Sequence, residues 1–185
     1  MYILFNIGDV STIPGYTLLM TSKTPWLNPE QEHLWRGWNR LNVELNATLQ
    51  RELQADAELS GSDYEVLVHL TDSPEGRVRV SDLARLLQWE RSRVSHHLTR
   101  MERRGLVERT ECLEDGRGAF IGVTVAGRAA IEHAAPGHVA AVRRLVFDLL
   151  DEKDTAALGA AIDKMLAGLH APTEDATFSR TTASP

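Results

Sequence analysis

The sequence predicts a mainly α-helical fold with one small β-hairpin, in the α+β class. Three observations lead to this prediction. Apolar residues recur at the three- or four-residue spacing of a helix face near both ends of the chain. Two shorter helical patterns follow one another closely in the middle. After them come two β-prone runs separated by an Asp-Gly pair, which favours a tight turn.

The composition is that of a single globular domain. The chain has 185 residues, of which 43% are hydrophobic and 25% charged. It contains no apolar run of the ~18 residues that a membrane-spanning helix needs, so we expect no membrane partner. Cys112 is the only cysteine, which excludes an intrachain disulfide and favours a cytoplasmic protein.

The first predicted helix covers residues 28 to about 53. Asn28 is a suitable N-cap, Pro29 suits the first helical position, and Glu30 and Glu32 place negative charge in the first turn. Its apolar face consists of Leu34, Trp38, Leu41, Leu45 and Leu49. Residues 1–27 precede it without the basic start of a secretory signal, and we expect them to form a flexible extension.

A second helix is predicted from Ser62, where residues 62–65 resemble a capping box, to about Ser73. Residues 78–80 alternate like a very short strand. Ser81 then caps a short helix that carries Leu83, Leu86 and Leu87.

The next helix is predicted from residue 90 or 91 to Arg104, with Gly105 ending it. Val94, Leu98 and Met101 should face inward. The residues expected to face outward are Arg93, His96, His97, Arg100 and Arg103. Residues 106–112 and 119–123 then form the β-hairpin, with residues 114–118 as its turn.

The C-terminal third is helical. Thr124 caps a long stretch that Pro136 and Gly137 should kink or break. A final helix is predicted over residues 151–169, and residues 171–185 have the composition of a disordered tail.

The order strand, helix, helix, hairpin is that of a winged helix-turn-helix, whose second helix enters the major groove of DNA. The charge agrees with this interpretation. The whole chain carries a net charge of −6, but residues 76–117 hold ten arginines and seven acids. The residues predicted to contact DNA are Arg91, Ser92, Arg93, Ser95, His96, His97, Arg100, Asp115 and Arg117.

Residues 83–109, followed by Asp115, Gly116 and Arg117, resemble the MarR family of regulators. The resemblance extends over about residues 28–170. It implies a homodimer that binds a pseudo-palindromic operator in double-stranded DNA. Residues 28–56 and 124–170 would form a helical dimerisation body, and residues 57–123 a DNA-binding lobe. Arg117 would be the wing arginine in the minor groove, with Asp115 as its orienting partner.

The same resemblance implies release of DNA by a small aromatic or acidic ligand in the crevice between body and lobe. The residues in question are Trp35, Trp38, Tyr64, His69 and Arg79, for which a structural role in the core is an equal alternative. A cysteine-based peroxide sensor is disfavoured, because Cys112 falls in the predicted wing. Zinc is left open as a cofactor. His33, His69, His133 and His138, with acids such as Glu132, could supply ligands, but their spacing does not favour a site.

These observations favour a sequence-specific transcriptional regulator, in the first instance a repressor. An enzyme is disfavoured because the chain has no glycine-rich phosphate loop, no HExxH motif and no nucleophile elbow. Two alternatives remain: a winged-helix module that binds protein, and a zinc-responsive regulator.

Overall fold

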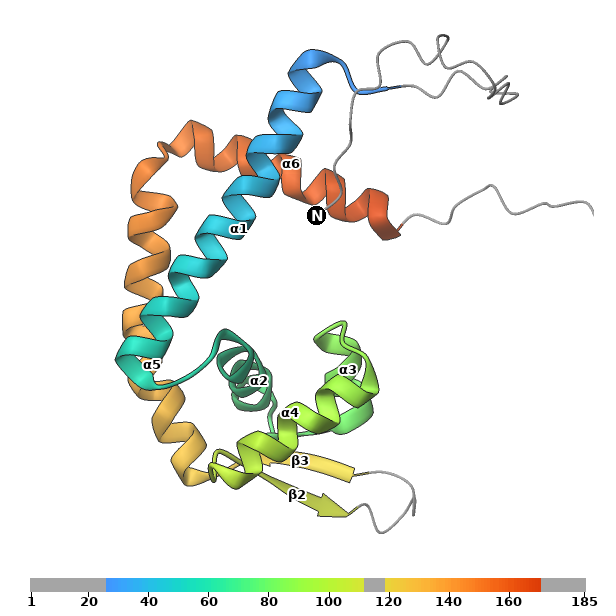
Figure 1. The fold of residues 1–185 in the computed structure, drawn as a ribbon, viewed down its shortest axis with the longest axis vertical. Coiled ribbons are helices and arrows are strands. Elements are labelled where there is room, and N and C mark those ends of the chain that lie inside the picture. Colours follow the sequence, from blue (N-terminus) through green and yellow to red (C-terminus); the bar gives the residue numbers. More distant parts are fainter. Residues whose placement is uncertain (1–25, 112–118, 171–185) are drawn as a thin grey trace, which may run out of the picture. The chain divides into compact units, whose positions relative to one another are not determined.

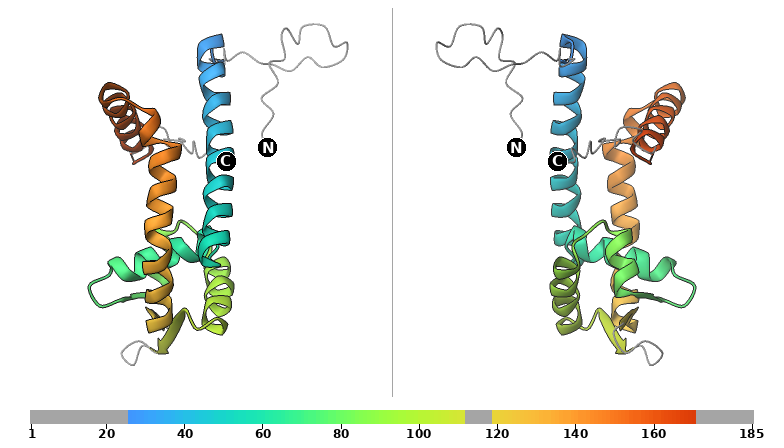
Figure 2. Two further views of the ribbon diagram at one scale, coloured as in Figure 1. Left: turned by 90° about the vertical axis from the view of Figure 1, so that its left-hand side faces the viewer. Right: turned by 90° about the vertical axis from the view of Figure 1, so that its right-hand side faces the viewer.

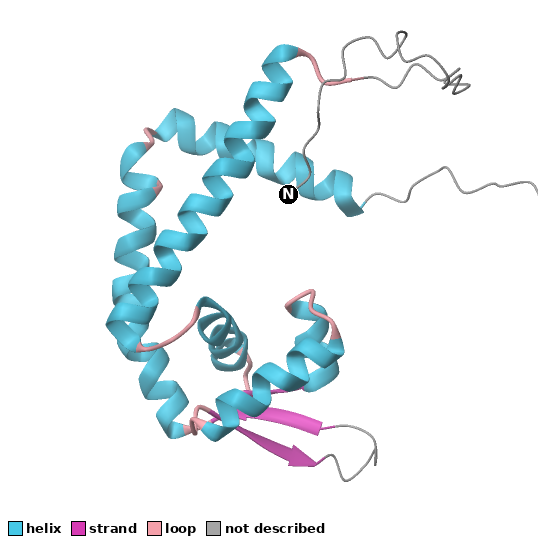
Figure 3. Cartoon of the chain, in the orientation of Figure 1, coloured by secondary structure: helices cyan, strands magenta, loops and turns pink. Residues whose placement is uncertain are grey.

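The computed structural model describes residues 26–111 and 119–170. Its elements are, in order, α1 (Pro29–Ala57), α2 (Gly61–Asp72), β1 (Arg77–Arg79), α3 (Val80–Leu86), α4 (Arg91–Arg103), β2 (Val107–Glu111), β3 (Ala119–Val123), α5 (Val125–Leu145), the 3-10 helix η2 (Phe147–Leu149) and α6 (Glu152–His170) (Figure 1). The predicted mainly helical α+β class is confirmed (Figure 3). No helix in the described part is long and apolar enough to cross a membrane.

The chain divides into two compact units between Arg40 and Leu41, within α1. In the first unit, Asn28 caps α1 as predicted: the Gln31 amide donates to Asn28 Oδ1 at 2.8 Å. In the second unit, α1 continues to Ala57, farther than predicted, and Glu58 ends it with a φ of 54°. The separation into a dimerisation body and a DNA-binding lobe stays a prediction.

The N-cap of helix α2 lies two residues earlier than predicted, because the capping box is formed by Ser60 and Asp63 rather than by residues 62–65. The Ser60 hydroxyl accepts from the Asp63 amide at 3.1 Å, and the Asp63 carboxylate accepts from the Ser60 amide at 2.9 Å. Starting at Gly61, the helix buries Val66, Leu67 and Leu70. The prediction was wrong because it required glutamate at the third helical position, whereas here an aspartate closes the box.

The three strands form one antiparallel sheet in the order β1-β3-β2. The predicted pairing of the two β-prone runs is confirmed, and β1 adds an edge strand to β3. Ile121 in the central strand pairs with Val78 on one side and with Arg109 on the other, and it is fully buried. The predicted hairpin turn and Cys112 lie outside the described residues.

Helix α3 starts at Val80, so Arg79 and not Ser81 occupies its N-cap, without a side-chain cap. The core lies between α2, α3, α4 and the sheet, and residues of α1 and α5 cover it. Gly105 follows α4 with a φ of 71°, which a glycine adopts without steric cost and which confirms its predicted place. Thr124 caps α5 as predicted, accepting from the Gly127 amide at 2.9 Å.

Of the kink or break expected at Pro136 and Gly137, the break does not occur, because helix α5 runs without interruption from Val125 to Leu145 (Figure 2). A proline inside a helix costs about 3 kcal/mol because it removes one hydrogen bond and crowds the preceding turn. Packing on both sides of the proline offsets this cost. Ala134 and Ala141 are buried, and Arg144 pairs with Glu52 of α1 at 2.7 Å.

We predict that Gly127→Ala destabilises the protein by about 1–3 kcal/mol, the range for overpacking. A Cβ at this position would stand 1.9 Å from the backbone oxygen of Leu106, which cannot move without displacing the chain between α4 and β2. The measurement is thermal or denaturant unfolding at one protein concentration. Gly137→Ala in the same helix is the matched control, since its Cβ would meet only Asp56 Oδ2 at 3.6 Å. A stability of Gly127→Ala equal to that of this control would contradict the argument.

Candidate nucleic-acid interface

Helix α4 has one buried and one exposed face. The buried face consists of Val94, His97, Leu98 and Met101. The exposed face carries six of the residues that the sequence predicted for DNA contact: Arg91, Ser92, Arg93, Ser95, His96 and Arg100. The structure therefore presents these six side chains together on one helix.

The N-terminus of α4 is electrostatically suited to an anion. Its N-cap residue, Glu90, forms no side-chain cap, and the first turn contains no acidic residue. The first backbone amides of a helix have no partner within the helix and carry partial positive charge. Arg91 and Arg93 add full charges at the same end. This arrangement favours a phosphate group at the start of the helix.

The position of α4 is fixed by α3 and the turn that joins them. Leu83, Ala84 and Leu87 are buried in the shared core. The Trp89 amide donates to the Ala84 oxygen at 2.9 Å, and Gln88 adopts a φ of 52° to make the turn. A non-glycine residue in this left-handed region costs roughly 1–2 kcal/mol, which the packed helices on either side must offset.

His97 does not face outward, so its prediction as an exposed DNA contact is wrong. The residue is only 6% exposed. Its Nε2 lies 3.1 Å from Asp63 Oδ1, and Arg100 Nη2 lies 2.9 Å from its Nδ1. The sequence did contain the signal, because residues 94, 97, 98 and 101 follow the spacing of one helix face.

Asp63 is the centre of a buried polar cluster that the sequence analysis missed. It is 4% exposed and accepts from Arg104 Nη1 at 2.7 Å, while Arg104 Nη2 donates to the Glu58 oxygen at 2.7 Å. Burial alone would raise the pKa of Asp63, but His97, the Ser60 amide and hydroxyl, and Arg104 together hold this pKa well below its usual range. The cluster ties α2 to the middle of α4 through His97 and to the C-cap residue of α4 through Arg104.

The wing residues Asp115 and Arg117 lie outside the described residues, so their DNA-contact role stays a prediction. Next to the wing, the guanidinium carbons of Arg77 and Arg79 lie 5.0 and 5.1 Å from the centre of the Phe120 ring. Arg79, predicted for the effector pocket, is thus held against the sheet.

The other predicted effector residues are spread over both units. Trp35 and Trp38 belong to the first unit and are exposed. In the second unit, His69 is half-buried on α2, and the Tyr64 ring lies 4.5 Å from that of His138, centre to centre. Burial raises the pKa of Tyr64 and lowers that of His138. The structure does not test an effector role for these residues.

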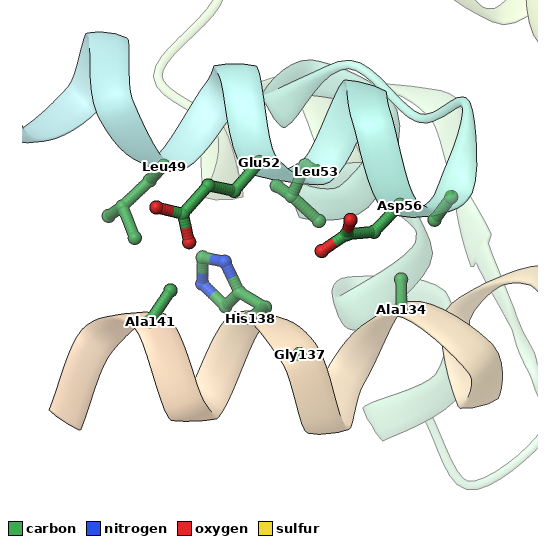
Figure 4. Close-up of a pocket in the computed structure, with 9 residues that line it drawn as sticks. Leu49, Glu52, Leu53, Asp56, Ala134, Gly137, His138 and Ala141 are labelled. Atoms are coloured by element: carbon green, nitrogen blue, oxygen red, sulfur yellow. The ribbon is translucent and has the colours of Figure 1, made fainter. Parts of the chain in front are cut away.

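Figure 4 shows a small pocket between α1 and α5, with His138 pointing toward α1. Its lining includes Leu49, Glu52, Leu53 and Asp56 and none of the predicted effector residues. Its cavity volume of ≈ 10 Å³ corresponds to about one water molecule. Within residues 26–111 and 119–170, no three histidine, cysteine or acidic side chains are placed to hold a metal ion.

The short strand β1, the pair α3 and α4, and the hairpin β2–β3 together define a protein with a winged helix-turn-helix. A sequence profile of the MarR family matches residues 57–118. AbsC, a MarR family transcriptional regulator from Streptomyces coelicolor, is 39% identical with a TM-score of 0.74, over 79% of this chain and 98% of AbsC. The chain belongs to the MarR family of transcriptional regulators.

Two further proteins are similar. Sco3205, a MarR family transcriptional regulator from Streptomyces coelicolor whose structure was solved in complex with DNA, is 37% identical with a TM-score of 0.75, over 82% of this chain and 96% of Sco3205. The HTH-type transcriptional repressor YetL of Bacillus subtilis is 27% identical over 95 residues, which are 51% of this chain and 57% of YetL. The chain thus spans little more than half the length of this relative.

We predict that Asp63→Asn lowers the free energy of unfolding at pH 7 by roughly 3 kcal/mol, because Arg104 loses its buried counter-charge and one of the two carboxylate oxygens that face Arg104 and His97 becomes an N–H donor. The pKa of Asp63 is depressed in the folded state, so its stabilisation is complete above the ordinary value of 3.8 and is lost as the pH falls below it. Denaturant unfolding of the wild-type protein and of Asp63→Asn should therefore show a difference in the free energy of unfolding that becomes smaller below about pH 4.

Asp82→Asn is the control for this measurement. Asp82 pairs with Arg85 at the surface, at 3.1 Å, and an exposed ion pair contributes only ~0–1 kcal/mol. An Asp63→Asn variant as stable as the Asp82→Asn variant at pH 7 would show that the buried cluster does not stabilise the fold.

Proposed function

We propose that this protein is a sequence-specific DNA-binding regulator that acts as a repressor, binds a pseudo-palindromic operator as a homodimer and is released by a small-molecule effector. The observation that carries the DNA-binding part is the exposed face of α4, where arginine and serine side chains surround a first helical turn that contains no acidic residue. The similarity to Sco3205, solved in complex with DNA, supports it. The repressor role is supported by the similarity to YetL, a transcriptional repressor.

The side chains on α4 match the chemistry of a base edge and a phosphate. An arginine can donate two parallel hydrogen bonds to guanine, and a serine hydroxyl can bind a base or a phosphate oxygen. Arg93 is proposed to contact bases, and Ser92 and Ser95 to bind the backbone. The family resemblance assigns Arg117 to the minor groove beside this helix.

We predict that Arg93→Ala weakens binding to the preferred sequence by about tenfold and relaxes base preference, because one base contact is lost. Arg117→Ala should weaken binding and also reduce the slope of log affinity against log salt by about 1. The measurement is a titration of labelled DNA, enriched by the protein from random sequences, with random competitor at several salt concentrations.

Arg143→Ala is the control for both variants, since it removes the same charge from the C-terminal turn of α5. Unchanged affinity in Arg93→Ala and Arg117→Ala would remove both assigned roles. If the wild-type protein shows no preference among sequences, the alternative of a module that binds an acidic protein partner is favoured instead.

The homodimer is supported by apolar side chains that the described chain leaves exposed. No residue of α6 is buried. Its exposed large apolar residues are Leu158, Met165, Leu166 and Leu169, and those of α1 include Leu34, Trp35, Leu41 and Val43. A monomer with these faces in water would forgo the hydrophobic stabilisation that two copies of the helices can supply. A symmetric dimer would also place two copies of α4 about 34–36 Å apart, one turn of DNA.

We predict that the double substitution of Leu166→Glu with Leu169→Glu converts the dimer to a monomer at micromolar concentration, because four carboxylates would meet in an apolar interface. Sedimentation velocity gives the mass, and the DNA titration should show a loss of affinity for the full operator. The matched control is Val125→Glu, whose residue is 90% exposed at the start of α5. A dimer that survives the double substitution would place the interface elsewhere.

The effector part rests on the family resemblance. The pocket between α1 and α5 has room for about one water molecule, which is too little for an aromatic acid. An effector therefore needs a wider site, and Trp35, Trp38, Tyr64, His69 and Arg79 are the residues proposed to line it. A screen of small aromatic acids for DNA release, repeated with these residues substituted, tests this part alone.

A further inference from the structure

Trp89 lies in the turn between α3 and α4, and Arg93 lies one helical turn further on. The guanidinium carbon of Arg93 is 4.1 Å from the centre of the Trp89 ring, the closest cation–ring approach in the described part of the chain. Tryptophan is the aromatic side chain that attracts a cation most strongly. The contact holds an exposed arginine against a half-buried ring.

The ring itself is held on two sides. The backbone amide of Trp89 donates a hydrogen bond to the Ala84 oxygen. The preceding residue, Gln88, has a left-handed backbone conformation, and its side chain donates a hydrogen bond to the Arg85 oxygen at 2.9 Å. The His97 ring stands at 88° to the indole, with centres 5.4 Å apart. His97 is in turn fixed by Asp63.

We propose that Trp89 is a positioning residue for base recognition, which holds the guanidinium of Arg93 in its binding orientation before DNA arrives. This inference rests on the proposed function. An exposed arginine samples many rotamers, and a binding partner must remove that freedom. A ring that has already restricted the side chain reduces this cost, so Trp89 strengthens specific binding without touching a base.

The geometry leaves the recognition chemistry of Arg93 intact. Stacking occupies the face of the guanidinium, whereas guanine is recognised by the N–H groups at its edge. Among the residues that the structure describes, Arg93 forms no ion pair with a carboxylate. Arg100, by contrast, is directed to His97 Nδ1. Arg93 is therefore the arginine on α4 that is oriented by an aromatic ring and still has its N–H groups available for a base.

A double-mutant cycle tests this inference with the full-length protein. The variants are Trp89→Leu, Arg93→Ala and the combination, and the probe is the double-stranded sequence that the wild-type protein enriches from a random library. We expect Trp89→Leu to weaken specific binding by about fivefold, with random DNA bound as before. In the Arg93→Ala background the same substitution should have no further effect, because the arginine it positions is absent.

Two further variants separate positioning from folding. Trp89→Phe should fall between the wild type and Trp89→Leu, because a phenyl ring attracts a cation less strongly. Leu86→Ala changes an exposed apolar residue of the neighbouring helix α3 and should leave specific binding unchanged. Thermal unfolding of each variant shows whether the lobe is intact. If Trp89→Leu does not fold, the cycle is run with Trp89→Phe. We then expect that the loss of specific binding caused by Trp89→Phe is absent in the Arg93→Ala background.

The outcomes are distinct. Losses that add in the double variant would overturn the inference and leave the proposed function intact, since Trp89 would then act only through the fold. A wild-type protein that enriches no sequence would overturn the proposed function, and this inference with it.

Discussion

The buried carboxylate of Asp63 joins the two helices on which the candidate interface depends. It closes the capping box that starts α2, and it faces His97 and Arg104 on α4. A buried charge without such partners would cost several kcal/mol. The register of α4 against α2 is therefore restricted to one in which the carboxylate is satisfied, and that register turns Arg91, Arg93 and Ser95 toward solvent.

Much of the fold followed from local rules, and the differences have local physical reasons. Helix periodicity and caps at Asn28 and Thr124 predicted α1 and α5, and the Asp-Gly pair predicted the strand pairing. Of the kink or break expected at Pro136, the break does not occur, because buried alanines on either side hold the helix through tertiary packing, whereas the effect of a proline is local. For the candidate site, the six predicted residues of α4 are exposed, and their contact with DNA stays a prediction. The Asp63 cluster was not predicted, because Asp63 and Arg104 lie 41 residues apart in sequence and only the fold brings them together.

Helix α6 differs from α2, α3, α4 and the sheet in how it is stabilised. Residues of α2, α3, α4 and the sheet are buried within the chain, whereas α6 buries none of its own. Most helical stability in proteins comes from the packing of an amphipathic face, and α6 has no buried residue to supply it. The exposed apolar residues of α1 and α6 therefore link the stability of these helices to the proposed self-association, whereas α2, α3, α4 and the sheet share a core to which Leu53 of α1 and Ile131 and Ala134 of α5 contribute.

The separation of α4 into two faces has an evolutionary consequence. The residues that anchor the helix and the residues proposed to read DNA are different side chains, apart from Arg100, which contacts His97 from the exposed side. Exposed residues can then be exchanged one at a time while the anchoring residues stay unchanged. Paralogues that share this scaffold could diverge in target sequence with little change in stability, which is a physical route by which one ancestral regulator gives rise to many with separate targets.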